Sequence, residues 1–318
     1  MAAAAPSSTS SRAQIARWIR RELARDPPRG KSLVVTVWGD SIAPHGGAVW
    51  LSSLIRLLAP LGLNERLVRT SVYRLTREGW LAARQDGRRS LYRLTSAGMQ
   101  RFEQAYRRIY ARSAVDWDGG WDIVLAPTAA LTAAQRRAVK RELAWEGFGP
   151  IAAGVFARPA RDHAGADVPG VVAGLGLGKH LVVLEGRDMP DPGGGTLRAY
   201  AKDCWDLTRI GAEYRTFLAR FGSVVACFRD ARTVDPEQSF VVRSLLIHAF
   251  RRVTLHDPQL PSELAPVGWP APRAYGLCRD FYRLTQRTAE EHLAATVETA
   301  DGPLPPPAPY FYERFGGL

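Results

Sequence analysis

The feature that most constrains this chain is a basic helix followed directly by a basic hairpin, within residues 64–95. Asn64 is a favourable N-cap, and the sequence after it is compatible with a helix. At about 100° per residue, Val68, Val72 and Leu75 fall on one side of this helix. The opposite side carries Arg66, Arg69, Thr70, Tyr73 and Arg77. The helix is therefore expected to bury one face and to expose guanidinium, hydroxyl and phenol groups on the other.

Two short runs with strand character follow this helix, at residues 80–83 and 90–94. Asp86-Gly87 lies between them and is a strong signal for a hairpin turn. The predicted hairpin carries Arg84, Arg88, Arg89 and Arg93. This order predicts a winged helix-turn-helix, in which the helix enters the major groove of DNA and the hairpin contacts the phosphate backbone. A solvated amphipathic helix beside a surface hairpin is the alternative interpretation.

The distribution of charge favours the DNA-binding interpretation. The chain has 318 residues and a formal net charge of +12. Residues 1–113 contain 20 Lys and Arg against 7 Asp and Glu, a net of +13, whereas residues 114–318 contain 23 against 24, a net of −1. All of the excess positive charge thus lies in the segment with the helix and hairpin, which indicates that this segment binds a polyanion. We expect no membrane association, because no apolar run approaches the ~18–20 residues that span a bilayer.

The cysteines and glycines point away from redox, metal and phosphate-loop chemistry. The three cysteines, Cys204, Cys227 and Cys278, are an odd number, and none lies at metal-clamp spacing from another. This favours a reducing compartment, so we expect a cytoplasmic protein without a zinc site. The Gly-rich run from Gly174 to Lys179 departs from both the phosphate-loop and the dinucleotide patterns. We predict a flexible loop there, and no catalytic residue, metal or cofactor in the chain.

The first two of five predicted segments form the basic part of the chain. Residues 1–29 are expected to be a disordered basic extension with a short amphipathic helix at 13–25, which docks on its own protein or on a dimer mate. Residues 30–113 are the predicted winged-helix domain, with earlier helices at 31–40 and 48–61. A further helix closes this domain before residue 113.

The other three segments make the predicted fold class a multidomain α+β protein. Residues 114–195 show a strand, a helix, a strand, a Gly/Asp/Pro loop and a strand, which suggests a ferredoxin-like α+β middle domain. Residues 196–300 follow a helical pattern and predict a mostly helical C-terminal domain. Residues 301–318 are a Pro-rich tail with aromatic residues at its end.

A possible ligand site lies in the helical segment. His248, Arg251 and Arg252 lie together, and Trp269 follows a proline-rich turn. Arginines beside an aromatic ring could hold a phosphorylated ligand that contains a ring. The alternative, which we favour, is a structural brace in which Arg252 pairs with Asp257 and Trp269 fills the core.

Two rival functions stay open at this point. Asp116, Asp118 and Asp122 near the first strand of the middle segment could bind a metal, as in a metal-dependent nuclease. The basic N-terminal part could instead bind RNA. Asp116 and Asp118 lie in a Gly-containing loop where acidic residues are common, so the nuclease is the weaker alternative.

Three blocks of sequence are similar to one known family. The blocks are Ser32–Leu81 with Gly87–Gly98, the motifs WDIVLAP and WEGFGPIAAGVF, and His248–Pro270 with its Arg-Arg, Asp-Pro, Leu-Pro and Trp-Pro pairs. Over roughly residues 30–290 the chain resembles the PaaX family of bacterial transcriptional repressors. The resemblance implies a homodimer that binds palindromic operator DNA, represses genes of phenylacetic acid catabolism, and leaves the DNA when an aryl-acyl-CoA such as phenylacetyl-coenzyme A binds.

The resemblance also places the site by position, with Asn64–Glu78 as the recognition helix and Trp80–Leu94 as the wing. The residues expected to contact DNA are Arg66, Arg69, Thr70, Tyr73, Arg74, Arg77, Arg84, Arg88 and Arg89. The residues expected to contact the effector are His248, Arg251, Arg252 and Trp269. The expected partners are double-stranded operator DNA, an acyl-CoA effector and a second copy of the chain.

Overall fold

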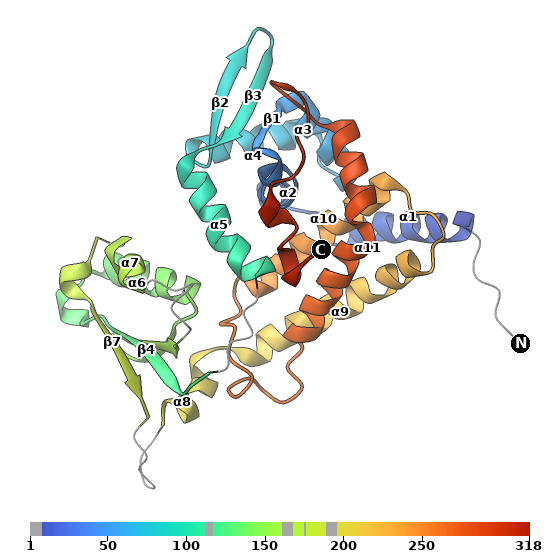
Figure 1. Ribbon diagram of the computed structural model, residues 1–318. Helices are drawn as coiled ribbons and strands as arrows, with labels where there is room; N and C mark the ends of the chain where they lie inside the picture. Colours follow the sequence, from blue (N-terminus) through green and yellow to red (C-terminus); the bar gives the residue numbers. More distant parts are fainter. Residues whose placement is uncertain (1–7, 112–116, 161–167, 175, 189–195) are drawn as a thin grey trace, which may run out of the picture. The chain divides into compact units, whose positions relative to one another are not determined.

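The computed structural model describes residues 8–111, 117–160, 168–174, 176–188 and 196–318, and the chain forms two compact units (Figure 1). The first unit combines Met1–Arg112 with Thr216–Arg251 and Pro272–Leu318, and the second combines Ser113–Arg215 with Arg252–Ala271. Helices and antiparallel sheets occur in both, so the chain is a multidomain α+β protein, as predicted. The five sequence segments themselves stay a prediction.

The N-terminal part of the first unit alternates helices with short strands. Its elements are α1 (Ser8–Arg25), α2 (Gly30–Val37), a π-helix η1 (Trp38–Ile42), η2 (Ala43–His45), β1 (Ala48–Trp50), α3 (Leu51–Leu58), η3 (Ala59–Leu61), α4 (Glu65–Arg77), β2 (Leu81–Asp86), β3 (Arg89–Leu94) and α5 (Ser96–Tyr110). The predicted helix and hairpin at residues 64–95 are confirmed as α4 followed by β2 and β3, and the hairpin projects from the helices around it (Figure 1).

The hairpin belongs to a three-stranded sheet with the order β1-β3-β2. Asp86 pairs with Arg89, so the two-residue turn consists of Gly87 and Arg88, one residue later than predicted. Gly87 has a φ of 55°, which suits glycine in a tight hairpin turn.

Strand β1 corrects the prediction of one helix over residues 48–61. The structure has β1 at Ala48–Trp50, then α3, then the 3-10 turn η3. Trp50 is extended at φ −68° and ψ 141° and pairs with Leu91. It is therefore the last residue of strand β1, and helix α3 begins at the next residue. A pairing partner more than forty residues away leaves no signal in local periodicity.

Helix α1 starts at Ser8, five residues before the predicted helix, and it docks on its own chain. Trp18 is buried, its ring lies 5.3 Å from that of Phe221, and its Nε1 donates to the carbonyl of Arg220 at 3.3 Å. Phe221 belongs to α9 (Leu207–Arg229), which with α10 (Pro236–Thr254) and α11 (Ala271–Thr296) forms the long predicted helices of the C-terminal part. The described residues therefore place α1 on the second half of its own chain. Residues 1–7 of the predicted disordered extension lie outside the described residues.

The Pro-rich tail is part of the folded first unit. After α11 come β8 (Glu298–Thr299), β9 (Gly302–Pro303), η6 (Pro309–Phe311) and η7 (Arg314–Gly316). Phe311, Arg314 and Phe315 are buried, and the amide of Ala308 donates to the carbonyl of Pro44 at 2.8 Å. The tail thus packs on the segment that leads into β1.

The second unit contains a four-stranded antiparallel sheet. Its elements are β4 (Gly120–Leu125), η4 (Thr128–Ala130), α6 (Ala133–Trp145), β5 (Gly149–Ala152), β6 (Val155–Pro159), α7 (Val168–Gly174), η5 (Gly178–His180), β7 (Val182–Arg187) and α8 (Leu197–Cys204). The sheet order is β5-β6-β4-β7, and each neighbouring pair is antiparallel. Helix α7 lies where the sequence predicted only a loop.

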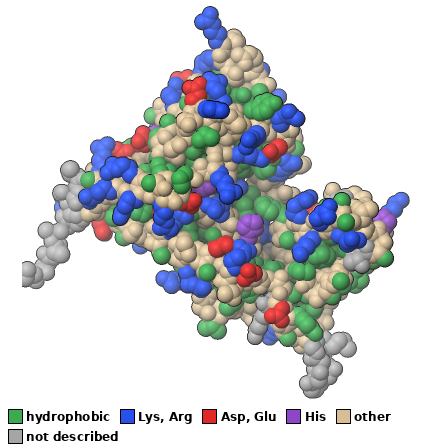
Figure 2. All heavy atoms as spheres, turned by 180° about the vertical axis from the view of Figure 1, so that it is seen from behind, with side chains coloured by type: hydrophobic (Ala, Val, Ile, Leu, Met, Phe, Trp, Pro, Cys, Tyr) green, Lys and Arg blue, Asp and Glu red, His purple; other side chains and the backbone are tan. Residues whose placement is uncertain are grey.

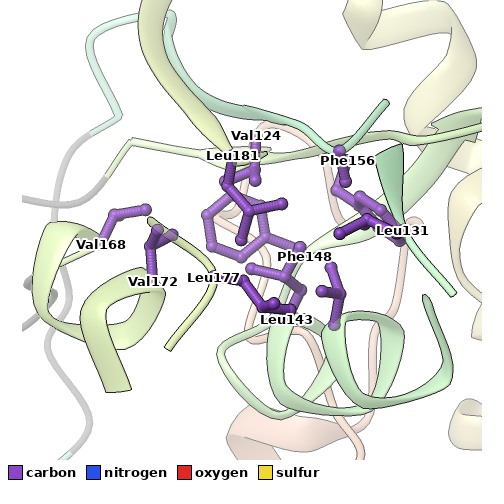
Figure 3. Close-up of a cluster of buried hydrophobic side chains, with 11 residues drawn as sticks. Val124, Leu131, Leu143, Phe148, Phe156, Val168, Val172, Leu177 and Leu181 are labelled. Atoms are coloured by element: carbon purple, nitrogen blue, oxygen red, sulfur yellow. The ribbon is translucent and has the colours of Figure 1, made fainter. Parts of the chain in front are cut away.

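Each face of this sheet has its own apolar core. On one face, Val124 and Phe156 pack with side chains from α6, α7 and the connecting turns (Figure 3). On the other face, Trp121 and Ala157 pack with Leu207 and with Leu260 of the segment after α10. The central strands β4 and β6 are therefore covered on both faces, although the sheet is antiparallel.

Candidate nucleic-acid interface

Helix α4 forms where predicted because its ends are capped and its apolar stripe is buried. The Asn64 side chain accepts a hydrogen bond from the amide of Leu67 at 2.9 Å. Val68, Val72 and Leu75 are buried against the neighbouring helices α2 and α3. Gly79, at φ 73°, then turns the chain into the hairpin.

The opposite face of α4 is open to solvent over its whole length. All six side chains that the sequence assigned to DNA on this helix are exposed: Arg66, Arg69, Thr70, Tyr73, Arg74 and Arg77. Leu67, at 44% exposure, adds an apolar side chain near the start of the helix. The face therefore offers several cationic donors, a hydroxyl, a phenol and one apolar group.

Two pairs of side chains hold part of this face in place. Glu65 binds Arg69 one turn later, with Oε1 2.8 Å from Nε. Arg77 donates weakly to the Tyr73 hydroxyl at 3.4 Å. Exposed pairs of this kind contribute at most about 1 kcal/mol, so Arg69 can exchange its carboxylate partner for an acceptor on DNA at little cost.

The hairpin arginines divide into two groups. Arg84, Arg88 and Arg93 are exposed, and Arg88 lies in the turn. Arg89 instead stacks over the ring of Trp50, 4.1 Å from its centroid, and forms an ion pair with Glu298 at 3.3 Å. Arg89 thus links the turn end of the hairpin to β1 and β8, and half of its side chain stays exposed.

The brace between the hairpin and the C-terminal segment could not be found from the sequence pattern. The indole Nε1 of Trp50 donates to the carbonyl of Thr299 at 2.8 Å, and Glu298 lies 209 residues from Arg89. No spacing rule links residues this far apart.

The four residues predicted to bind an effector lie in different compact units. His248 and Arg251 belong to the first unit, where each lies 2.8 Å from the hydroxyl of Thr36 on α2. Burial lowers the pKa of Arg251. Arg252 and Trp269 belong to the second unit, where Trp269 packs edge-on against Tyr214. The role of these four residues stays a prediction.

The structural-brace alternative for this region named Asp257 and Trp269, and the second unit holds both side chains by contacts of its own. The pair of Arg252 with Asp257 stays a prediction. The Asp257 carboxylate accepts from the Tyr214 hydroxyl at 2.8 Å and from the Gln259 amide at 2.7 Å. Trp269 packs against an apolar cluster, as that alternative expected.

The acidic residues of the rival nuclease prediction are engaged by arginines. Asp122 accepts from Arg158 at 2.9 Å, and both side chains are buried. Asp118 pairs with Arg187, and a hydrogen bond from the Gly120 amide helps to lower its pKa. Asp116 lies outside the described residues. In the part of the chain that is described, no three His, Cys, Asp or Glu side chains gather as metal ligands would.

Comparisons with known proteins identify the family. Family models described as a PaaX-like protein, a central Cas2-like domain of PaaX and a PaaX-like C-terminal domain match residues 29–98, 114–196 and 205–295. The transcriptional repressor PaaX of Escherichia coli (strain K12) is 37% identical over 293 residues, which cover 92% of each protein. The chain belongs to the PaaX family.

The resemblance predicted from the sequence is thus confirmed, and PaaX membership makes the chain a transcriptional regulator and not an enzyme.

A solved structure of the uncharacterized protein Rv0674 from Mycobacterium tuberculosis is 25% identical, with a TM-score of 0.49, and the match covers 76% of this chain and 89% of that one. Among the described helices of this PaaX-family chain, none is long and apolar enough to cross a bilayer.

Proposed function

We propose that this PaaX-family protein is a cytoplasmic, homodimeric repressor of an aromatic-acid catabolic operon of the phenylacetate type. It binds double-stranded operator DNA and is released by an acyl-CoA thioester such as phenylacetyl-coenzyme A. The observation that carries the DNA-binding part is the exposed face of α4, which presents four arginines, Thr70 and Tyr73 beside a basic hairpin.

In this proposal the segment from α3 to β3 works as a winged helix-turn-helix. Helix α3 and the turn η3 precede α4, and the β2–β3 hairpin follows it at once, which is the order that such a domain requires. Helix α4 enters the major groove, where Arg66, Arg69 and Arg77 meet base edges, and Arg84 and Arg88 contact phosphates. Two copies related by a two-fold axis would meet the two halves of a palindromic operator.

The middle of the chain is a ferredoxin-like domain in this proposal. The element order β4-α6-β5-β6-α7-β7 is the βαββαβ pattern of that fold, and its antiparallel sheet order supports the same assignment. In the sequence, this domain lies between the DNA-binding segment and the C-terminal helices.

Replacement of single arginines should separate base recognition from phosphate binding. Arg69→Ala is expected to cost about 1–3 kcal/mol on the operator and much less on random DNA, because it removes a base contact. Arg88→Ala should weaken binding to every sequence alike and make the salt dependence shallower. Titrations of each variant by fluorescence anisotropy on both duplexes measure this difference. Equal losses on operator and random DNA for Arg69→Ala would contradict its assigned role.

The complete proposal is tested by a gel shift on DNA upstream of the protein's own gene, with and without phenylacetyl-coenzyme A. Specific binding that the thioester releases is the expected result. Specific binding that ignores it would keep the repressor and exclude this effector, and other acyl-CoA thioesters would then be screened. A lack of preference over random DNA would overturn the proposal.

A further inference from the structure

Helix α1 presents a second basic surface that has no part in the proposed contacts of α4. Arg17, Arg20, Arg21 and Arg25 are all exposed, and at about 100° per residue they lie within an arc of about 140°. We call them the α1 arginine face. Figure 2 shows Lys and Arg side chains gathered at several places on one face of the molecule. The family models begin at residue 29, so none of them includes this helix.

The other side of α1 fixes the helix to the first unit. Ile15 and Trp18 are buried, and the buried carboxylate of Glu22 pairs with Arg220 of α9. Arg220 also binds Asp26 at 3.0 Å. These contacts fix α1 against α9, so the position of the α1 arginine face on the first unit is defined.

The spacing of these arginines opposes helix stability. Arg17 and Arg21 are four residues apart, as are Arg21 and Arg25, and like charges at this spacing cost a helix roughly 0.2–0.5 kcal/mol per pair. Within the described residues, no Asp or Glu forms an ion pair with any of the four. Two exposed arginines on other helices do have an acidic partner one turn away, Arg209 in Glu213 and Arg287 in Glu291.

We infer that the α1 arginine face binds the phosphate backbone of duplex DNA, as a second contact beyond α4 and the hairpin. This inference rests on the proposed DNA-binding function. Duplex phosphates suit the face because Trp18, the aromatic residue of α1, is buried and cannot stack on the bases of a single strand. The face also has no large exposed apolar side chain that would enter a membrane.

The dimensions of the face fit several phosphates. Arg17 and Arg25 are eight residues apart and therefore about 12 Å apart along the helix axis. Each DNA strand carries a phosphate about every 3.4 Å of duplex axis. Each phosphate contact adds about 0.9 to the slope of log affinity against log salt concentration. Full engagement of the four arginines therefore adds about 3–4 to that slope.

The test compares two variants of the full-length protein that lose the same charge. One replaces Arg17, Arg20, Arg21 and Arg25 by Gln, and the other replaces the exposed residues Arg137, Arg141, Arg209 and Arg287 by Gln. Salt titrations use a duplex with the operator and long flanks, and a random duplex of equal length. We expect the first variant to lose about 3–4 units of slope on both duplexes and to keep its ratio of operator to random affinity. The second should lose less than about one unit.

Equal slopes for the two variants would overturn the inference, as would a loss confined to duplex RNA or to anionic lipid vesicles. Failure of the proposed function gives a different result. In that case the wild-type protein would show no preference for the operator, whereas the change of slope in the first variant would still report on α1.

Discussion

Replacing Arg314 by Leu is expected to destabilise the first unit by about 3–5 kcal/mol. The Arg314 side chain is fully buried, and its Nη1 donates to the carbonyl of Asp40 at 2.9 Å and to the Tyr282 hydroxyl at 2.7 Å. Its guanidinium also lies 4.3 Å from the ring centroid of Tyr110. Leucine would leave the buried carboxylate of Asp40 without one of its two cationic neighbours.

The loss is large because the whole cluster is closed to water. Asp40 lies in the π-helix η1 and accepts from the hydroxyls of Tyr110 and Tyr282, and burial raises the pKa of both phenols. The second neighbouring cation, Arg243, lies 3.7 Å from Asp40 and is shared with Glu290. Because domains are stable by only about 5–15 kcal/mol, a change of this size removes a large part of the total.

Urea unfolding followed by tryptophan fluorescence measures this prediction, with Arg287→Leu as a matched control. Arg287 is paired with Glu291 at 2.7 Å, but 83% of its side chain is exposed, so its loss should cost less than about 1 kcal/mol. In a double-mutant cycle, Asp40→Asn with Arg314→Leu should destabilise less than the sum of the single changes, because no isolated charge remains buried. A cost for Arg314→Leu as small as that of the control would contradict the prediction.

The position of this cluster shows why only part of the fold could be predicted. Helix α4 was predictable because its cap, its apolar stripe and its terminal glycine are local signals within one stretch of sequence. The burial of Arg314 was not, because Asp40 lies 274 residues away and a proline-rich tail gives no periodic signal. The sequence pattern therefore described this tail only by its composition.

The errors in the second unit and the sheet have local causes. Helix α7 has only seven residues and includes a proline and glycines, so it is too short to show a helical period. Strand β1 has three residues and follows Gly46 and Gly47, both at positive φ. Elements this short are stabilised by tertiary contacts, as β1 is by pairing with β3 and α7 is by packing in the apolar cluster of the second unit.

The candidate site shows the same division between local and distant information. Exposure of the α4 arginines followed from helical spacing, and even the Glu65–Arg69 pair could be found from its four-residue separation. The partners of Arg89 could not be found in this way, since Trp50 and Glu298 come from separate parts of the chain. Helical spacing thus identifies the exposed face of α4. The tertiary structure, in contrast, determines which arginines, such as Arg89, have side-chain partners from distant parts of the chain.

Acid should remove a specific part of the stability of the first unit between about pH 4.5 and pH 2. Burial alone would raise the pKa of Glu290, but Arg243 at 2.9 Å and His45 at 2.9 Å outweigh it and lower this pKa to about 2. A carboxyl whose pKa is lower in the folded state stabilises the fold above its unfolded pKa of about 4.5, and this contribution disappears as the pH falls to about 2. The shift corresponds to about 3 kcal/mol.

Unfolding free energies of the wild type, Glu290→Gln and Glu291→Gln at several pH values between 7 and 2 test this expectation. Glu290→Gln should be strongly destabilised at pH 7, because it leaves the buried Arg243 without its closest carboxylate. Its deficit relative to the wild type should shrink as the pH falls from about 4.5 to 2, because the wild type then protonates the same carboxyl. Glu291→Gln makes the same chemical change one residue away, at a side chain that is 47% exposed, and should follow the wild type throughout. A deficit of Glu290→Gln that stays constant down to pH 2 would show that the Glu290 carboxylate does not supply the acid-sensitive part of the stability.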